Sequence, residues 1–87
     1  MTAALTPACH VRKAIAKWLE VDPADITDGK HLRLGLGADT LSMMDVIMEV
    51  EDALEVEIDD DIIEQIVTVG DLIGWAEKLV GEAAVAA

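Results

Sequence analysis

Residues 40–54, TLSMMDVIMEVEDAL, decide the fold, because their apolar side chains recur at the spacing of an α-helix. At roughly 100° per residue, one set of these side chains gathers on a single side of the helix, as a stripe that faces a core must. The set comprises Met43, Val46, Ile47, Val50 and Leu54. We expect a helix that begins at Asp39 or Thr40 and ends at Leu54 or Glu55.

The same stretch carries a second stripe on the opposite side of the helix, formed by Leu41, Met44 and Met48 and flanked by acidic side chains. A helix on the surface of a small domain needs only one apolar stripe. The second stripe is therefore either covered by another part of the domain or is a contact surface for a partner. Pliable methionine thioethers suit a surface that meets several partners.

A first helix is expected from Thr6 and Pro7 onward, where a capping hydroxyl precedes a proline at the first helical position. An apolar stripe at helical spacing follows as far as Leu19. Trp18 lies on that stripe and is interpreted as a core anchor. Residues 21–38 are rich in aspartate and glycine and break the period, so they predict a long loop with one turn near its start, and such loops are usually functional.

The C-terminal part of the chain predicts a short helix and a long one. Residues 60–65 favour a short third helix with its isoleucines turned inward. Thr68-Val-Gly-Asp71 resembles a capping box and opens a fourth helix, which carries Trp75 on its apolar stripe as a second core anchor. Gly81 is expected to end this helix, and residues 82–87 are expected to fray.

The whole pattern predicts one all-α domain over residues 1–87, with its core at about 7–80. Its fold class is a four-helix bundle of three main helices and a short third helix, with a long loop between the first two helices. A chain of 87 residues buries only roughly 60–65% of its unfolded surface. That leaves little room for an enclosed active site and favours a module that acts through its surface over an enzyme.

The charge excludes several classes of partner. The chain has 18 acidic and 6 basic residues, a net charge of −12 and a pI near 4.1. Nucleic acid and anionic membrane surfaces would repel it. We expect basic protein partners, no nucleic acid, no membrane insertion and a monomer, and the absence of a targeting pattern at the N-terminus favours a cytoplasmic location.

Acidic residues are densest between positions 45 and 64, where no basic residue occurs. This run is either a solvated face that gives solubility or an electrostatic docking surface. Asp59-Asp60-Asp61 lacks the order of an EF-hand loop. Cys9 and two histidines fall short of a zinc ligand set, so no metal site is expected.

Residues 35–41, GLGADTL, deliver a hydroxyl to the first turn of the helix at 40–54. Asp39 and Thr40 are favoured helix caps and would be well placed there without any further function. A helix N-terminus is also where backbone N–H groups and the macrodipole favour a phosphate group. The two interpretations are compatible.

At these residues the sequence resembles the acyl carrier protein family. Residues 36–41, LGADTL, are similar to the L-G-A-D-S-L signature of that family. Residues 56–60, VEIDD, resemble its acidic V/T-E-I-P-D segment, and residues 66–69, IVTV, resemble the I-x-T-V that opens its last helix. The similarity covers roughly residues 8–80 in register, which makes it far more specific than the hexapeptide alone.

The resemblance implies a carrier that is not itself an enzyme and that holds acyl or aminoacyl groups as thioesters on a 4′-phosphopantetheine arm, as in fatty acid and other lipid biosynthesis. It leaves the cargo open among fatty, polyketide, aminoacyl and lipid-A-type groups. It places Thr40 at the attachment position, flanked by Asp39 and Leu41. It also implies partners with basic docking patches: phosphopantetheinyl transferase, acyl and aminoacyl ligases, synthases and transferases. Carried over by position, the partner-binding residues are Met44, Asp45, Met48, Glu51, Asp52, Ile58 and Asp60.

Three positions depart from the family pattern. Thr40 stands where the family has serine; its hydroxyl can form the same phosphodiester, but the γ-methyl restricts χ1 and crowds the attacking oxygen. We therefore expect slow attachment or none, and without attachment the chain would be an acidic binding or regulatory module that uses the same helix. Ser42 and Gly35 stand where the family usually has acidic residues.

Overall fold

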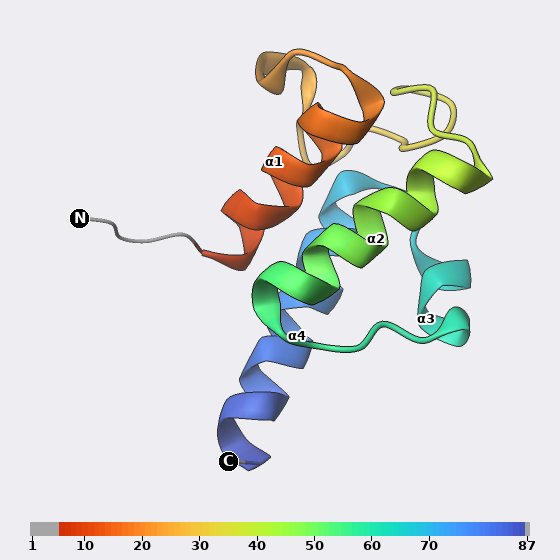
Figure 1. Cartoon of the computed structure of the whole chain (residues 1–87). Coiled ribbons are helices and arrows are strands. Elements are labelled where there is room, and N and C mark those ends of the chain that lie inside the picture. The colour runs from red at the N-terminus through yellow and green to blue at the C-terminus, as the bar shows by residue number, and fades with distance from the viewer. Residues whose placement is uncertain (1–5, 87) are drawn as a thin grey trace.

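The structure, a computed structural model, describes residues 6–86, and this part of the chain is helical (Figure 1). The elements, in chain order, are α1 (Pro7–Leu19), the 3-10 turn η1 (Pro23–Asp25), α2 (Thr40–Leu54), α3 (Asp60–Gln65) and α4 (Val69–Ala86). The prediction of an all-α fold with three main helices and a short third helix is confirmed. Residues 1–5 and 87, the ends of the expected domain, lie outside the described residues.

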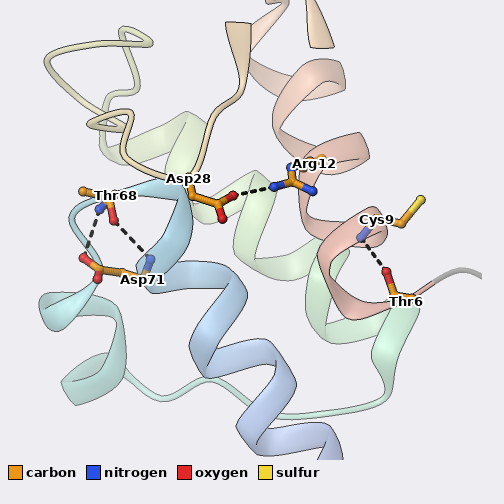
Figure 2. Close-up of polar contacts among 6 residues, drawn as sticks. All are labelled: Thr6, Cys9, Arg12, Asp28, Thr68 and Asp71. Atoms are coloured by element: carbon orange, nitrogen blue, oxygen red, sulfur yellow. Dashed lines mark hydrogen bonds and ion pairs between the residues drawn. The ribbon is translucent and has the colours of Figure 1, made fainter. Parts of the chain in front are cut away.

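Local capping explains where the helices begin. The Thr6 hydroxyl accepts a hydrogen bond from the Cys9 N–H at 3.2 Å and caps α1 (Figure 2). The Asp71 carboxylate accepts from the N–H groups of Val67 and Thr68, each at 3.0 Å, while the Thr68 hydroxyl accepts from the Asp71 N–H. These bonds, first the Thr68 N–H and then the Val67 N–H, hold the pKa of Asp71 below its usual range. The capping box expected at the start of α4 is thus confirmed.

The helix ends differ more from expectation. α1 and α2 end at glutamates in the left-handed region, Glu20 with φ 54° and Glu55 with φ 56°. Glycine is the residue that favours this conformation, so no glycine in the sequence announces either end. α4, in contrast, passes through Gly81 in helical conformation and runs to Ala86. The expected stop at Gly81 is wrong, because a single glycine costs a helix only about 1 kcal/mol and its neighbours are mostly good helix formers. The fraying expected over residues 82–87 stays a prediction.

The core lies where α1, α2 and α4 meet. Each of these helices contributes a stripe of buried residues, as the periodicity predicted. They are Val11, Ala14 and Ile15 from α1, Met43, Val46, Ile47 and Val50 from α2, and Val69, Leu72, Ile73 and Ala76 from α4. The loops add Ile26, Leu32, Leu36 and Ile58. In and after α3 the isoleucines turn inward as expected, with Ile62 and Ile63 half-buried and Ile66 buried.

The two tryptophans do not share one role. Trp75 is half-buried and packs against the core. Trp18 is 38% exposed, and its indole N–H donates to the Glu49 carboxylate of α2 at 3.0 Å. The interpretation of Trp18 as a core anchor is wrong, because its N–H finds its acceptor at the surface. None of the helices within residues 6–86 is long and apolar enough to cross a bilayer.

Candidate functional site

Thr40 is the first residue of α2, and its side chain is exposed. The approach loop, residues 31–39, leads the chain to it. Leu36 and Ala38 of this loop are buried, and Gly37 between them has a φ of 78°, which favours glycine. The Ala38 N–H donates to the Leu32 carbonyl at 2.9 Å. The backbone directly before Thr40 is therefore anchored to the core, while Thr40 itself is exposed.

Asp39 caps α2 through a reciprocal box with Ser42. The Asp39 carboxylate accepts from the Ser42 N–H at 2.8 Å and from the Ser42 hydroxyl at 2.6 Å, and the Ser42 hydroxyl accepts from the Asp39 N–H at 3.1 Å. The Ser42 hydroxyl, followed by the Ser42 N–H, holds the pKa of Asp39 below its usual range. Sequence analysis missed this role of Ser42, although the spacing of an aspartate and a serine three residues later carries the signal.

Gly35 lies in a tight turn. The sequence showed only that it stands where the family usually has an acidic residue. A Cβ atom at this position would lie 2.8 Å from the carbonyl oxygen of His31. That distance is shorter than van der Waals contact allows, so any larger residue would force the turn apart. The approach loop thus depends on glycine at position 35 for close approach and at position 37 for its backbone angle.

The position of the Thr40 hydroxyl fits a phosphodiester. It lies at the N-terminus of a helix of 15 residues, where backbone N–H groups and the macrodipole stabilise negative charge. Ser42 is the only other hydroxyl of α2, and it is held by Asp39. Thr40 is therefore the hydroxyl in this helix that an incoming phosphate could reach without disrupting the cap.

The second stripe lies on the outer side of α2. Leu41 is 73% exposed, Met44 42% and Met48 55%. No described part of the chain covers these side chains, whereas the opposite stripe of α2 is buried. A cover by residues 6–82 is thus excluded, and a contact surface for a partner stays a prediction.

The acidic residues assigned to partner binding fall into two groups. Asp52 and Asp60 are exposed and Asp45 is half-buried, so all three reach solvent beside the second stripe or at the start of α3. Glu51 is half-buried, and its carboxylate accepts from the Ile58 N–H at 2.7 Å. This contact ties the loop between α2 and α3 back onto α2.

Ile58 is not a surface residue. Its side chain is 4% exposed and belongs to the core. The hydrogen bond from its N–H to Glu51 draws this part of the loop against α2. The assignment of Ile58 as a partner contact is therefore wrong for this conformation, because its side chain packs inside the domain.

A groove of about 360 Å³ opens between the approach loop, α2 and α3. Its lining residues are His31, Leu32, Arg33, Met43, Ile63, Glu64, Ile66 and Val67. Met43 lies three residues after Thr40, which is close to one helical turn. A larger groove of about 690 Å³ lies along α1 and includes no residue of α2. Among the described residues, no three of histidine, cysteine, aspartate or glutamate come together as a metal site would require.

Comparison with known proteins assigns the family. The sequence profile of the family described as phosphopantetheine attachment site matches residues 9–76. The acyl carrier protein of Exiguobacterium sibiricum is 40% identical over 70 residues, which cover 80% of this chain and 89% of that protein. The acyl carrier protein of Thermotoga maritima is 38% identical over 71 residues, which cover 82% of this chain and 88% of that protein.

The chain belongs to the acyl carrier protein family. Members of this family are carriers and not catalysts, and their prosthetic group is 4′-phosphopantetheine. The expectation of an acyl carrier function, drawn from the sequence, is confirmed at this level. Members of the family interact in general with biosynthetic enzymes and with phosphopantetheinyl transferases.

Proposed function

We propose that Thr40 is the residue that carries the phosphopantetheine arm and that Asp39 and Leu41 flank this attachment site. The observation that carries the proposal is the exposed Thr40 hydroxyl at the first position of α2, on a backbone anchored by the buried Leu36 and Ala38. The bound arm supplies a thiol that forms a thioester with the acyl group. Its attachment requires only that Thr40 offer a free hydroxyl at a fixed position.

In the attachment step, the phosphopantetheine group is transferred from coenzyme A to Thr40. A bond forms between the Thr40 Oγ1 and the phosphorus that bears pantetheine, and the pyrophosphate bond to the adenosine bisphosphate half breaks. The hydroxyl proton passes to a base of the transferase. The part of Asp39 in this chain is to hold the start of α2 through Ser42, so that the hydroxyl keeps its position during transfer.

The second stripe and the exposed acids form the surface that partner enzymes read. Apolar side chains of Leu41, Met44 and Met48 lie beside the carboxylates of Asp45 and Asp52. Such a surface complements a basic patch with an apolar centre. We assign this surface to phosphopantetheinyl transferase and to acyl or aminoacyl ligases, synthases and transferases that carry basic patches. Asp60 lies at the edge of the surface. These enzymes act in the cytoplasm on a monomeric carrier.

The groove between the approach loop, α2 and α3 is the place on this chain where cargo could be sheltered. It is lined on one side by Met43 and on the other by Ile63 and Ile66. Because Met43 lies about one turn from Thr40, an arm attached to Thr40 starts beside this groove. Apolar cargo would be favoured there over water.

Intact-protein mass spectrometry tests the attachment site. The chain, Thr40→Ser and Thr40→Ala are each incubated with coenzyme A and a broad-specificity phosphopantetheinyl transferase. We expect Thr40→Ser to gain the mass of one arm quickly, and the threonine form to gain it about a hundredfold more slowly, because the γ-methyl displaces the attacking oxygen. Thr40→Ala should gain nothing.

Two outcomes contradict the proposal. Modification of Thr40→Ala would place the attachment elsewhere, with Ser42 as the nearest hydroxyl. Failure of both the threonine and the serine form would leave the alternative function, an unmodified acidic module that binds through α2. Circular dichroism of each variant controls for folding, and Thr40→Ser should keep the stability of the chain, since residue 39 and not residue 40 is the cap.

A further inference from the structure

His31 is the residue on which the turn at the start of the approach loop closes. Its carbonyl oxygen accepts from the N–H groups of Gly35 at 2.8 Å and Leu36 at 3.0 Å. Its side-chain Nδ1 accepts from the Leu34 N–H at 3.0 Å. Three consecutive backbone N–H groups, from residues 34 to 36, are therefore satisfied by this one residue.

The same residue joins the approach loop to the start of α4. His31 forms an isolated antiparallel bridge with Thr68. On either side of it, the Leu32 N–H donates to the Val67 carbonyl at 2.9 Å and the Val69 N–H donates to the Lys30 carbonyl at 3.0 Å. On the far side of this bridge the Asp71 carboxylate accepts from the N–H groups of Val67 and Thr68, and Figure 2 shows the second of these contacts.

The turn is connected to Thr40 through a short series of backbone contacts. Leu32 follows His31 and its carbonyl accepts from the Ala38 N–H at 2.9 Å. Ala38 directly precedes Asp39, the cap of α2. Only residues 37–39 thus separate the turn at residues 31–36 from the proposed attachment position, and Ala38 among them is buried.

The hydrogen bond from the Leu34 N–H to the His31 imidazole depends on the protonation state of the ring. The two hydrogen bonds to the His31 carbonyl do not. Nδ1 accepts a hydrogen bond only while it carries no proton, and an imidazolium has an N–H at both nitrogens. Protonation would set that N–H against the N–H of Leu34. Histidine is the side chain that makes this change between roughly pH 5 and 8.

Charged residues of both signs lie near His31 in the groove, along the sequence and across the bridge to Thr68. Arg33 and Glu64 line the same groove as His31, and α2 contributes the uncharged Met43. Lys30 directly precedes His31, and Asp71 lies behind Thr68 on the side of α4.

We propose that His31 is a positioning residue for the attachment site: its unprotonated Nδ1 holds the Leu34 amide in the turn that leads to Thr40, and protonation of the ring releases that amide. The coupling to Thr40 rests on the proposed attachment site. The rate at which the arm is attached to this chain then decreases at acidic pH because of a change in the carrier, and not only because of the transferase. The hydrogen bond can be tested apart from loading.

NMR titration of the amide of Leu34 tests the hydrogen bond. In the unmodified chain, its resonance should move between pH 5 and 8 with the midpoint of the His31 ring protons. In His31→Asn the amide oxygen takes the place of Nδ1 as an acceptor that does not titrate, so the resonance should become independent of pH. His10→Asn is the matched control and should leave the titration of Leu34 unchanged. A Leu34 resonance that does not follow His31 would overturn the proposal.

Loading rates test the coupling. They are measured at pH 5.5 and 7.5 for Thr40→Ser, which loads fast, and for the double variant Thr40→Ser/His31→Asn. The ratio of the first rate to the second at each pH cancels the pH dependence of the transferase. We expect this ratio to fall about tenfold at the lower pH, since small displacements of a reacting group cost rate steeply. An unchanged ratio would overturn the positioning role. If no variant loaded at any pH, the proposed attachment site would be at fault, while the Leu34 titration would still decide the hydrogen bond.

Discussion

α1 and α2 pack against each other and each buries one apolar stripe, yet their charges are opposite. α1 carries Arg12, Lys13 and Lys17 and no acidic residue. α2 carries four acidic residues and no basic one. Only α2 adds a second apolar stripe, which is exposed.

The difference lies in where the charges find their partners. Arg12 pairs with Asp28 of the long loop (Figure 2), and Lys17 with Glu49 of α2 at 3.1 Å. Two of the three basic residues of α1 are thus used inside the domain, where they offset the repulsion among its acidic residues. Asp45 and Asp52 of α2 have no such contact among the described residues. The charges of α1 therefore serve the fold, while Asp45 and Asp52 of α2 are left free for the partner surface that we propose.

The largest expected effect is on stability, and it should differ between substitutions in the buried stripe and in the exposed stripe of α2. Ile47→Ala should lower the free energy of unfolding by about 2–5 kcal/mol, because it leaves a cavity in the core. Ile15→Ala should cost the same amount from α1. Met48→Ala, beside Ile47 in sequence but exposed, should cost under about 0.5 kcal/mol. Urea unfolding followed by circular dichroism measures all three, and a cost for Met48→Ala similar to that of Ile47→Ala would show that the second stripe is part of the core.

An intermediate effect should separate the outer faces of α1 and α2. Asp45→Lys should slow association with phosphopantetheinyl transferase about tenfold at low salt and weaken its salt dependence, since charges at the rim of an interface act mainly on the association rate. Met44→Glu should weaken binding at every salt concentration. Lys13→Glu on α1 is the matched control and should not slow association. Stopped-flow mixing measures the rates, and equal losses from Asp45→Lys and Lys13→Glu would remove the distinction between the two helices.

The smallest effect concerns Glu49, where α1 and α2 meet. The Trp18 indole, and after it Lys17, hold the pKa of Glu49 below its usual range. Because the pKa is lower in the folded than in the unfolded chain, this contact stabilises fully above about pH 5 and is lost as the pH falls through the folded value. Glu49→Gln should thus lower the free energy of unfolding at pH 7 by under about 1 kcal/mol, since the pair is partly exposed. Urea unfolding at pH 7 and pH 3 should show the difference between the two proteins disappear at pH 3; a difference that persisted would mean that the charge of Glu49 is not its source.

Most of the fold could be predicted because helical period and capping act within about four residues. Residues 40–54 predicted α2 with both of its stripes, and Thr68 with Asp71 predicted the start of α4. A hydroxyl in the first turn of α2 could be predicted for the same reason, since Thr40 follows a cap and precedes an apolar period. The proposal that Thr40 carries the arm rests on the resemblance to the family. Ser42 could have been found by the same rule, because its contact with Asp39 spans three residues.

The sequence by itself determined which segments are helical, which side of each faces a core, and that a hydroxyl stands at the start of α2. The tertiary structure alone decided that Trp18 turns outward to Glu49, that Ile58 turns inward, and that His31 closes the approach loop against Thr68. These outcomes depend on contacts between residues far apart along the chain, as the sequence separation of 31 between Trp18 and Glu49 shows. Local periodicity does not predict which distant residue a side chain contacts, because that contact is determined only when the helices pack against each other.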